Sequence, residues 1–326
     1  MPGIRRSLLV WFAACVLAGA PLSATGSKSD EGVRLFESGK LAEARSALEE
    51  AVREDGGDAR AASYLGRVLL ADSEIDRAAL WMERSVALEE GNAEYHLWLG
   101  RAYGSQAVRA AVLKQPALAR KVKREFERAS RLDPDNLEAR FALIEYYLRA
   151  PGLLGGSAKK ADEQAREIRK RDALQGYRAF GRLAELRKDF DQALREYARA
   201  AAEFPEKSEP SYWMAALHTG NREYAKAFAV YEALLEKDPG QVAACYQIGQ
   251  LAVLSGQRFE RGEECLKRYL RHDPKPDEPS LASAHYRLGL LYQKHGSRDL
   301  ARREYSAALE LEPSYPEARD ALKNLS

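Results

Sequence analysis

Residues 151–160 read PGLLGGSAKK and have the composition of a phosphate-binding loop, with three glycines and two lysines. Such a loop requires G-x-x-x-x-G-K-[ST] after a strand, because its backbone N–H groups cradle the phosphates. Counting from Gly152, Ser157 stands where the second glycine should be, and the residues before Pro151 predict a helix. Spacing and context therefore both argue against a phosphate site.

A lengthened turn between two helices explains the same stretch. Pro151 ends the first helix, the glycines accept positive φ at low cost, and Ser157 can cap the next helix. Leu153 and Leu154 then lie on a protruding loop. A contact between these two leucines and a partner is the alternative interpretation.

Residue patterns typical of metal binding or catalysis are absent from the sequence. The five histidines form no H-x-x-x-H or H-E-x-x-H spacing, and G-x-S-x-G does not occur. His96, His218 and His285 fall at positions expected to pack between helices. We therefore expect no metal, no cofactor and no enzymatic activity.

The first 24 residues have the order of a secretory signal peptide. Arg5 and Arg6 precede an apolar run over residues 8–20, and small residues follow it. This run is short for a bilayer-spanning helix, and no later run is long enough for one. We expect cleavage after Ala24 and a periplasmic chain. Cys15, in the stretch FAAC, leaves lipoprotein anchoring as an alternative.

Removal of this segment would change the charge balance. The 51 Lys and Arg residues lose Arg5 and Arg6, which leaves 49 against 49 Asp and Glu. A nucleic-acid-binding domain usually carries a basic excess. We therefore expect no nucleic-acid partner.

Two cysteines remain in the mature chain, Cys245 and Cys265. If Gly249 packs against Gly262 in an antiparallel helix pair, the cysteines lie about 6 and about 4.5 Å from these glycines in the same direction. Their side chains would then face each other. A disulfide is one interpretation, because an exported chain meets an oxidising compartment. Two buried small apolar residues are the other.

The elements that carry these residues are predicted to be helices throughout. The chain is 45% apolar and 31% charged, and strand-like runs are nearly absent. Proline recurs near expected helix ends, and Pro205 and Pro239 are 34 residues apart. Proline cannot continue the preceding helix, so it separates units of similar length.

Each unit repeats two short patterns on its predicted helices. The first helix carries Leu-Gly-x-x-Tyr or a variant of it, and the second carries small, large and small residues at spacings of four and three. These spacings place the residues on one helix face. The patterns occur as Leu99, Gly100 and Tyr103; Leu288, Gly289 and Tyr292; Leu65, Gly66 and Leu69; Ala44, Leu48 and Ala51; Ala193, Tyr197 and Ala200; and Ala301, Tyr305 and Ala308.

The period and the patterns resemble the tetratricopeptide-repeat family. The resemblance implies an all-α fold, a right-handed superhelical α-solenoid of about eight helix-turn-helix units with a C-terminal capping helix over 316–326. The expected units are 28–58, 59–92, 93–136, 137–173, 174–207, 208–241, 242–275 and 282–315. Insertions are expected between the helices of the third and fourth units and before the last. With the leader, the insertions in the third and fourth units resemble those of exported bacterial members that carry a Pro-Gly-x-x-Gly-Gly loop.

The resemblance also implies a concave binding face. In the family, the fifth, ninth and twelfth positions of a unit point to that face. Here the fifth and ninth positions are aromatic toward the C-terminus and basic toward the N-terminus. Tyrosines that only fill gaps between units are the alternative. The candidate partner-binding residues are Arg67, Leu97, Trp98, Arg101, Phe141, Arg182, Tyr212, Tyr246 and Tyr286. Arg178 and Arg182 stand where chaperone-binding members carry Lys and Asn, which argues against recognition of a free C-terminal carboxylate.

Two functional hypotheses follow from the leader and the repeats. The first is a non-enzymatic scaffold, exported to the bacterial cell envelope, that binds a protein or peptide on its concave face. The second is a binder of envelope glycan or peptidoglycan, or an accessory subunit of an envelope assembly machine, because aromatic rows also suit sugars. The sequence predicts no oligomeric state.

Overall fold

The computed structural model describes residues 27–275 and 278–325, in which there are seventeen α-helices, one 3₁₀ turn and no strand. The all-α expectation is therefore confirmed. The expected signal peptide, with Cys15, lies outside the described residues.

The helices form eight antiparallel pairs and a final single helix. They are α1 (Lys28–Glu37) with α2 (Leu41–Glu54), α3 (Ala59–Ala71) with α4 (Ile75–Leu88), α5 (Ala93–Arg109) with α6 (Gln115–Leu132), α7 (Leu137–Arg149) with α8 (Ala158–Arg171), α9 (Ala173–Leu186) with α10 (Phe190–Glu203), α11 (Glu209–Gly220) with α12 (Tyr224–Lys237), α13 (Val242–Ser255) with α14 (Phe259–Tyr269), α15 (Leu281–Lys294) with α16 (Arg298–Leu311), and α17 (Pro316–Lys323).

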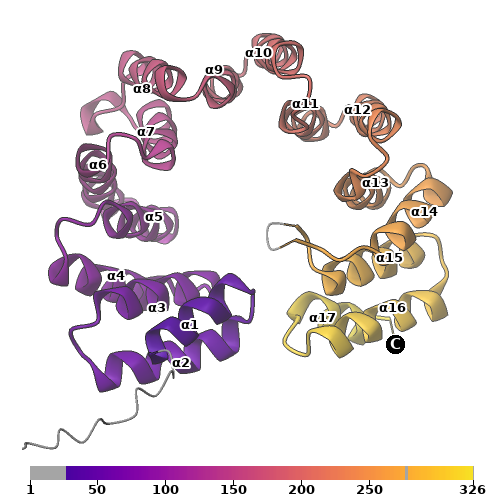
Figure 1. Ribbon diagram of the computed structural model, residues 1–326, viewed down its shortest axis with the longest axis horizontal. Coiled ribbons are helices and arrows are strands. Elements are labelled where there is room, and N and C mark those ends of the chain that lie inside the picture. The colour runs from indigo at the N-terminus through magenta and orange to yellow at the C-terminus, as the bar shows by residue number, and fades with distance from the viewer. Residues whose placement is uncertain (1–26, 276–277, 326) are drawn as a thin grey trace, which may run out of the picture.

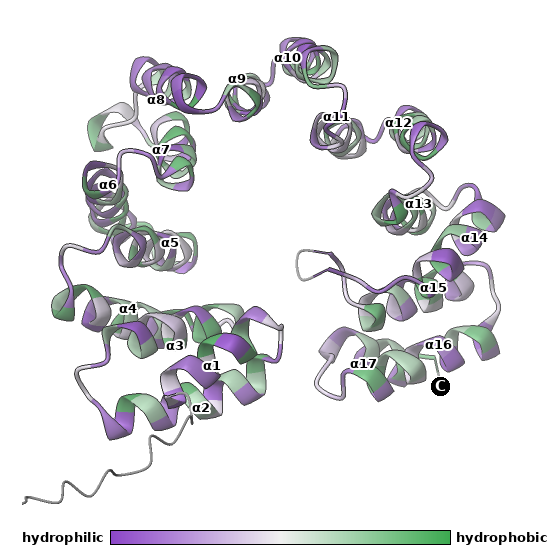
Figure 2. Cartoon of the chain, in the orientation of Figure 1, coloured by the Kyte–Doolittle hydropathy of each residue, from purple (hydrophilic) through white to green (hydrophobic). Residues whose placement is uncertain are grey.

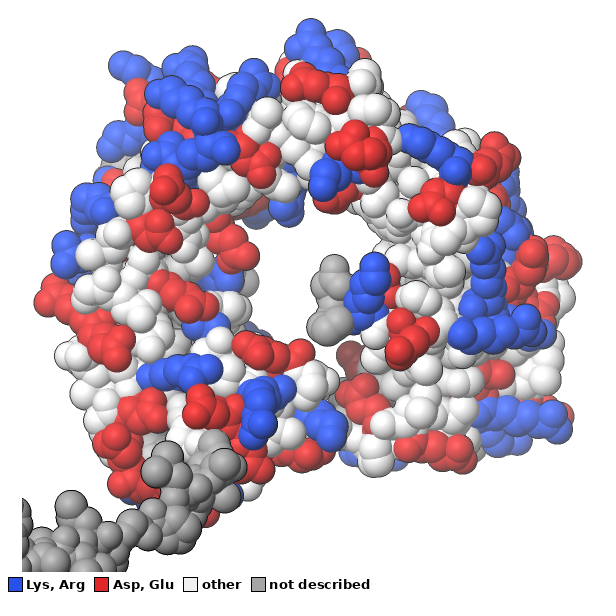
Figure 3. Space-filling view, in the orientation of Figure 1, with Lys and Arg blue, Asp and Glu red and all other residues white. Residues whose placement is uncertain are grey.

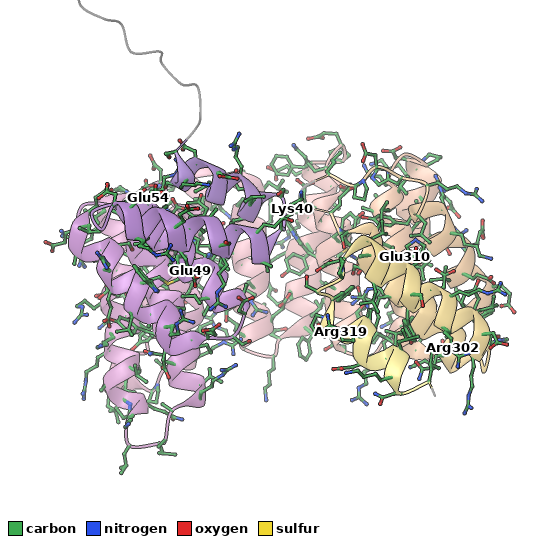
Figure 4. The ribbon with its side chains drawn as sticks, turned by 90° about the horizontal axis from the view of Figure 1, so that it is seen from below. Lys40, Glu49, Glu54, Arg302, Glu310 and Arg319 are labelled. Carbon is green, nitrogen blue, oxygen red and sulfur yellow. The ribbon has the colours of Figure 1, made fainter. Side chains whose placement is uncertain are left out.

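The pairs stack into an α-solenoid that bends into an incomplete ring (Figure 1). Most contacts join the two helices of one pair or the helices of neighbouring pairs. The space-filling view shows an opening through the middle of the ring (Figure 3). From below, the first pair, with Glu49 and Glu54, and the last, with Arg302 and Glu310, face each other (Figure 4).

Glycine in the first helix lets the second helix approach closely. A Cβ atom on Gly100 would lie 2.4 Å from the ring of Phe126, and one on Gly289 would lie 2.5 Å from the ring of Tyr305. Each large side chain therefore occupies the space that the glycine leaves open. This packing explains why the glycine of the Leu-Gly-x-x-Tyr pattern recurs along the chain.

Apolar and polar residues are segregated on the helices, as an amphipathic stack requires. Figure 2 shows hydrophobic and hydrophilic residues on each of the helices, and the small residues Ala44, Ala193 and Ala301 are fully buried. Buried residues of neighbouring pairs form clusters that span several units, such as the one from Ala215 to Leu325. The core is thus shared between units, and no unit buries its apolar face alone.

The third-unit insertion differs from the expectation. The extra residues were expected between the two helices, but most of them lengthen both helices. Helix α5 has 17 residues and α6 has 18, whereas α4 has 14, and the turn between α5 and α6 is short, residues 110–114. Pro116 lies in the first turn of α6, where a missing N–H costs no intrahelical hydrogen bond.

The stretch at residues 151–160 is a structured turn between α7 and α8. The 3₁₀ turn η1 (Gly152–Leu154) ends at Gly155, whose φ is 95°, and the Ser157 hydroxyl accepts a hydrogen bond from the Lys160 N–H, which confirms the predicted cap. The Tyr146 hydroxyl donates to the Leu154 carbonyl at 2.7 Å. Leu153 is 85% exposed, whereas Leu154 is partly buried. The two leucines therefore differ: Leu154 tucks under the loop and Leu153 faces solvent.

No helix in the described part of the chain combines the length and apolarity needed to cross a membrane.

Candidate binding groove on the inner face

The inner face of the ring is formed by the first helices of successive pairs, and its middle part, from α5 to α11, is hollowed. A pocket of about 550 Å³ opens there between α5, α7, α9 and α11. Its lining includes three arginines, three glutamates and three large aromatic residues, namely Arg101, Arg178, Arg182, Glu138, Glu145, Glu185, Phe141, Tyr197 and Trp213. A second pocket, of about 570 Å³, shares Arg101 and Glu138 and extends the hollow to Trp98 and Asn92. We call this continuous surface the inner groove.

Arginines and aromatic rings alternate along the inner groove. The Arg101 guanidinium lies 4.5 Å from the centre of the Trp98 ring. The Arg178 guanidinium lies 5.1 Å from the Phe141 ring and 6.0 Å from the Trp213 ring. Such cation–π contacts hold the guanidinium planes in place while leaving their N–H groups free to donate.

Glutamates join most of these arginines across neighbouring units. Arg101 contacts Glu138 at 2.5 Å, and Arg182 contacts Glu145 at 2.5 Å and Glu185 at 2.6 Å. Burial alone would lower the pKa of Arg182, but its hydrogen bonds to Glu145 and Glu185 raise that pKa above the ordinary arginine value. Arg182 is therefore held as a cation between two carboxylates.

Arg178 differs from its neighbours. Its hydrogen bond goes to the Gln175 side chain at 3.3 Å, and no carboxylate in residues 27–275 or 278–325 forms an ion pair with it. Its side chain is exposed on the groove. Arg178 is thus positioned to bind an anionic group that comes from another molecule.

Three of the predicted groove residues are buried instead of exposed, which corrects the expectation. Leu97 is 2% exposed, Tyr246 is 4% exposed and Arg67 is 5% exposed. Arg67 is covered by the rings of Tyr64 and Trp98 and by an ion pair with Glu94 at 2.9 Å. Arg67 and Tyr246 are therefore closed to a partner in the groove, and Leu97 contributes only a small area to the second pocket.

Tyr246 shows why the expected aromatic ladder does not form an open surface. Its ring packs 5.2 Å from that of Tyr269, and its hydroxyl contacts Ser283 at 2.6 Å and the Arg287 guanidinium. These partners lie on α14 and α15, so Tyr246 fills the space between two units.

The other two tyrosines of the ladder are half-buried. Tyr212 packs on Tyr231 at 5.6 Å, and Tyr286 packs on Tyr305 and Tyr315 at 5.8 and 5.3 Å. The Tyr212 hydroxyl is buried without a hydrogen-bond partner in the described part of the chain. The gap-filling alternative therefore describes the C-terminal half of the ladder better.

The groove contains residues that the sequence prediction left out. Trp213 was missed, although it occupies the same position in its unit as Trp98 does in the third. Arg178 stands at the fifth position of its unit but was considered only against the chaperone-binding pattern. Glu138 and Glu185 carry no signal of their own, because glutamates on helix surfaces are common.

The histidines are dispersed and paired with glutamate. His96, His218, His272 and His285 each contact a Glu carboxylate at 2.6 to 2.7 Å, and His295 stacks on Phe259. In the residues that the structure describes, no group of three or more His, Cys, Asp or Glu residues could hold a metal ion. His96, His218 and His285 lie between the helices of their own pairs or at a helix end, in the packing positions expected of them.

The two cysteines are adjacent, buried and free in this structure. A Cβ atom on Gly262 would lie 3.8 Å from the Gly249 Cα, so these glycines pack as expected. The hydrogen bond between the two thiols, together with burial, raises the pKa of the Cys265 thiol. The thiols therefore face each other, while the disulfide stays a prediction.

The family model for the tetratricopeptide repeat matches residues 29–93, 178–242, 246–316 and 286–326. The chain belongs to the tetratricopeptide-repeat family. Proteins of this family typically act as non-enzymatic scaffolds that bind protein partners. The match leaves out residues 94–177, which contain both lengthened units.

Similarity to individual proteins is low and concerns the repeats. The chain is 26% identical over 141 residues to the general transcriptional corepressor ssn6 of Schizosaccharomyces pombe. The aligned region covers 43% of this chain and 12% of the corepressor. A tetratricopeptide-repeat protein of Thermus thermophilus has a TM-score of 0.48 at 20% identity, over 58% of this chain and 96% of that one. One from Parabacteroides merdae has a TM-score of 0.45 at 13% identity, over 92% and 99%.

Proposed function

We propose that the chain is a scaffold that binds an extended segment of a partner protein in the inner groove. The observation that carries this proposal is Arg178, exposed between two aromatic rings and without a carboxylate partner in the described chain. The neighbouring arginines Arg101 and Arg182 already have such partners. The open position at Arg178 favours a segment with an acidic side chain, and Phe141 and Trp213 favour an apolar residue beside it.

A glycan ligand is less well supported by the same surface. Sugar rings stack on open aromatic faces, but arginine lies over the rings of Trp98 and Phe141. A peptide needs no open ring face, since it can pair with arginine and pack against ring edges. The peptide hypothesis therefore explains more of the groove.

We also propose that the chain is exported to the bacterial cell envelope. The basic, apolar and small-residue order of residues 1–24 supports export, and the Pro-Gly-x-x-Gly-Gly stretch that starts at Pro151 supports a relationship to exported bacterial members of the family. Fractionation of cells that produce the full chain tests this proposal. Recovery of an unprocessed chain in the cytoplasm would contradict it.

Site-directed crosslinking tests the groove and the ligand class together. A photoreactive residue at Ala142 or Ala216, which line the pocket, should crosslink to a protein that mass spectrometry identifies. The same residue at Ala198, exposed on α10, is the control. Crosslinks to the same proteins from the groove positions and from Ala198 would contradict peptide binding in the groove. Retention of the chain on cell-wall sacculi without any protein crosslink would also contradict it.

A further inference from the structure

The four most exposed large apolar side chains in the described part of the chain lie in two turns or in the last helical turn before one of them. Val108, Val112 and Leu113 are 85%, 77% and 94% exposed at the end of the α5–α6 hairpin, and Leu153 is 85% exposed in η1. Both turns join the two helices of a unit, in successive units, so they lie on the same edge of the solenoid. Helix α6 contacts η1, and a Cβ on Gly155 would lie 2.6 Å from the Lys123 ammonium. Exposed apolar residues that gather in this way mark an interaction surface.

The charge around these turns is of one sign. Residues 104–124 and 146–161 contain no Asp or Glu. Their basic residues are Arg109, Lys114, Arg120, Lys121, Lys123, Arg124, Arg149, Lys159 and Lys160. We call these two segments the apolar-basic edge.

Three cations of the apolar-basic edge are free to meet an external anion. Lys114, Arg120 and Lys159 are exposed, and no carboxylate in residues 27–275 or 278–325 forms an ion pair with them. Other cations of the edge, such as Lys121 and Lys123, have glutamate partners. The free cations follow Leu113 and Leu153 in the sequence.

The shape and composition of this edge favour a bilayer over a protein. The exposed residues are aliphatic and stand on projecting turns, whereas protein hot spots favour Trp, Tyr and Arg in pockets. Aliphatic side chains on a projecting turn can enter the acyl boundary, while lysine and arginine bind the phosphate groups around them. We propose that the apolar-basic edge docks peripherally on a membrane surface rich in anionic phospholipid headgroups. This inference is independent of the inner groove.

Co-sedimentation with vesicles tests the proposal. The chain from Thr25 onward is used, because residues 8–20 would themselves enter a bilayer and all the described helices lie after Ser27. It should sediment with vesicles of phosphatidylcholine and phosphatidylglycerol at low salt, and weakly with phosphatidylcholine alone. The double variant Val112→Asp, Leu113→Asp should reduce the partition coefficient at least about tenfold. Each of Lys114→Gln, Arg120→Gln and Lys159→Gln should reduce it about fivefold.

A matched control is the double variant Leu80→Asp, Leu311→Asp, which changes two exposed leucines outside the edge. It should sediment like the unchanged chain, with circular dichroism confirming that both double variants keep their helicity. Equal sedimentation of both double variants, or no sedimentation of the unchanged chain, would overturn the proposal. Dimerisation lost only in the Val112, Leu113 variant, without vesicle binding, would assign the edge to a second copy and would also overturn it.

Discussion

His96 and Glu125 form a buried pair across the two helices of the third unit, with 2.7 Å between the His96 Nδ1 and a Glu125 oxygen. Both side chains are 5% exposed, and the His96 Nε2 lies 2.9 Å from the Glu90 carbonyl. Both ring nitrogens therefore face oxygen atoms that accept hydrogen bonds when the carboxylate is ionised. Arg124 also contacts Glu125, so the carboxylate lies between two donors.

Replacing Glu125 by Gln should destabilise the chain, because it leaves a buried hydrogen-bond network incomplete. We expect the free energy of unfolding to fall by about 3 kcal/mol in urea denaturation. Glu304→Gln, at the more exposed His285–Glu304 pair, is the control and should cost clearly less. Equal losses for the two variants would show that burial of the third-unit pair does not matter.

Gly100→Ala should destabilise the third unit, since the new Cβ would lie 2.4 Å from the Phe126 ring. We expect a loss of about 1 to 3 kcal/mol in the free energy of unfolding. Gly104→Ala, one turn later in the same helix, meets nothing within 4 Å and should be neutral or stabilising. The same melting temperature for both variants would contradict the close helix approach.

Tyr246→Ala should lower the stability of the fold, because Tyr246 is a core residue. Any loss of ligand binding should follow from this loss of stability. We expect a loss of about 3 to 5 kcal/mol in the free energy of unfolding. Tyr246→Phe keeps the ring and loses only the hydroxyl contacts, so it should cost about 1 kcal/mol. A stable Tyr246→Ala chain that no longer binds its partner would instead return Tyr246 to the binding surface.

Arg178→Gln should weaken partner binding without a change in stability. Because Arg178 lacks a carboxylate partner in the described chain, its replacement breaks no ion pair there. We expect the Kd for the crosslinked partner to rise at least about tenfold in isothermal titration calorimetry. Arg195→Gln is the matched control, since Arg195 is exposed on α10 and also contacts a glutamine three residues before it. An unchanged Kd for Arg178→Gln would remove the residue from the binding site.

Cys245 and Cys265 should form a disulfide when the chain folds in an oxidising compartment. Both cysteines are buried, and they lie on the paired helices α13 and α14 of the seventh unit. Closing this loop should stabilise the chain by about 3 kcal/mol relative to the reduced form. Thiol counting on unreduced, denatured protein that was folded under oxidising conditions is the measurement, and two free thiols would refute the bond.

The repeat fold could be predicted well from the sequence, because the same residue pattern recurs in several units and each occurrence supports the others. The first helices begin within one residue of the expected unit starts, at Lys28, Ala59 and Ala93 for example. Glycine, proline and alanine mark contacts inside one unit, and such contacts recur at a fixed spacing. Ser157 could be assigned as a cap for the same reason: its partner, Lys160, is three residues away.

The binding surface was harder to predict, since it depends on contacts between units. Tyr246 and Arg178 both stand at the fifth position of a unit, yet Tyr246 is buried and Arg178 is exposed. The residues of the neighbouring units determine this difference in exposure. Ser283 and Arg287 of α15 cover Tyr246, whereas Phe141 and Trp213 lie beside Arg178 without enclosing it. A position in the repeat fixes the direction of a side chain, and the residues of the next unit fix how far it is covered.

The incomplete ring has a mechanical consequence. Each unit is held mainly by its immediate neighbours, so a small rotation at each interface adds up along the eight pairs. The distance between the first pair and the last can therefore change at low energetic cost. A segment bound across α5, α7, α9 and α11 spans four consecutive units and would set the curvature of that arc. Occupancy of the groove would then be transmitted to the two ends of the chain as a change in the width of the gap.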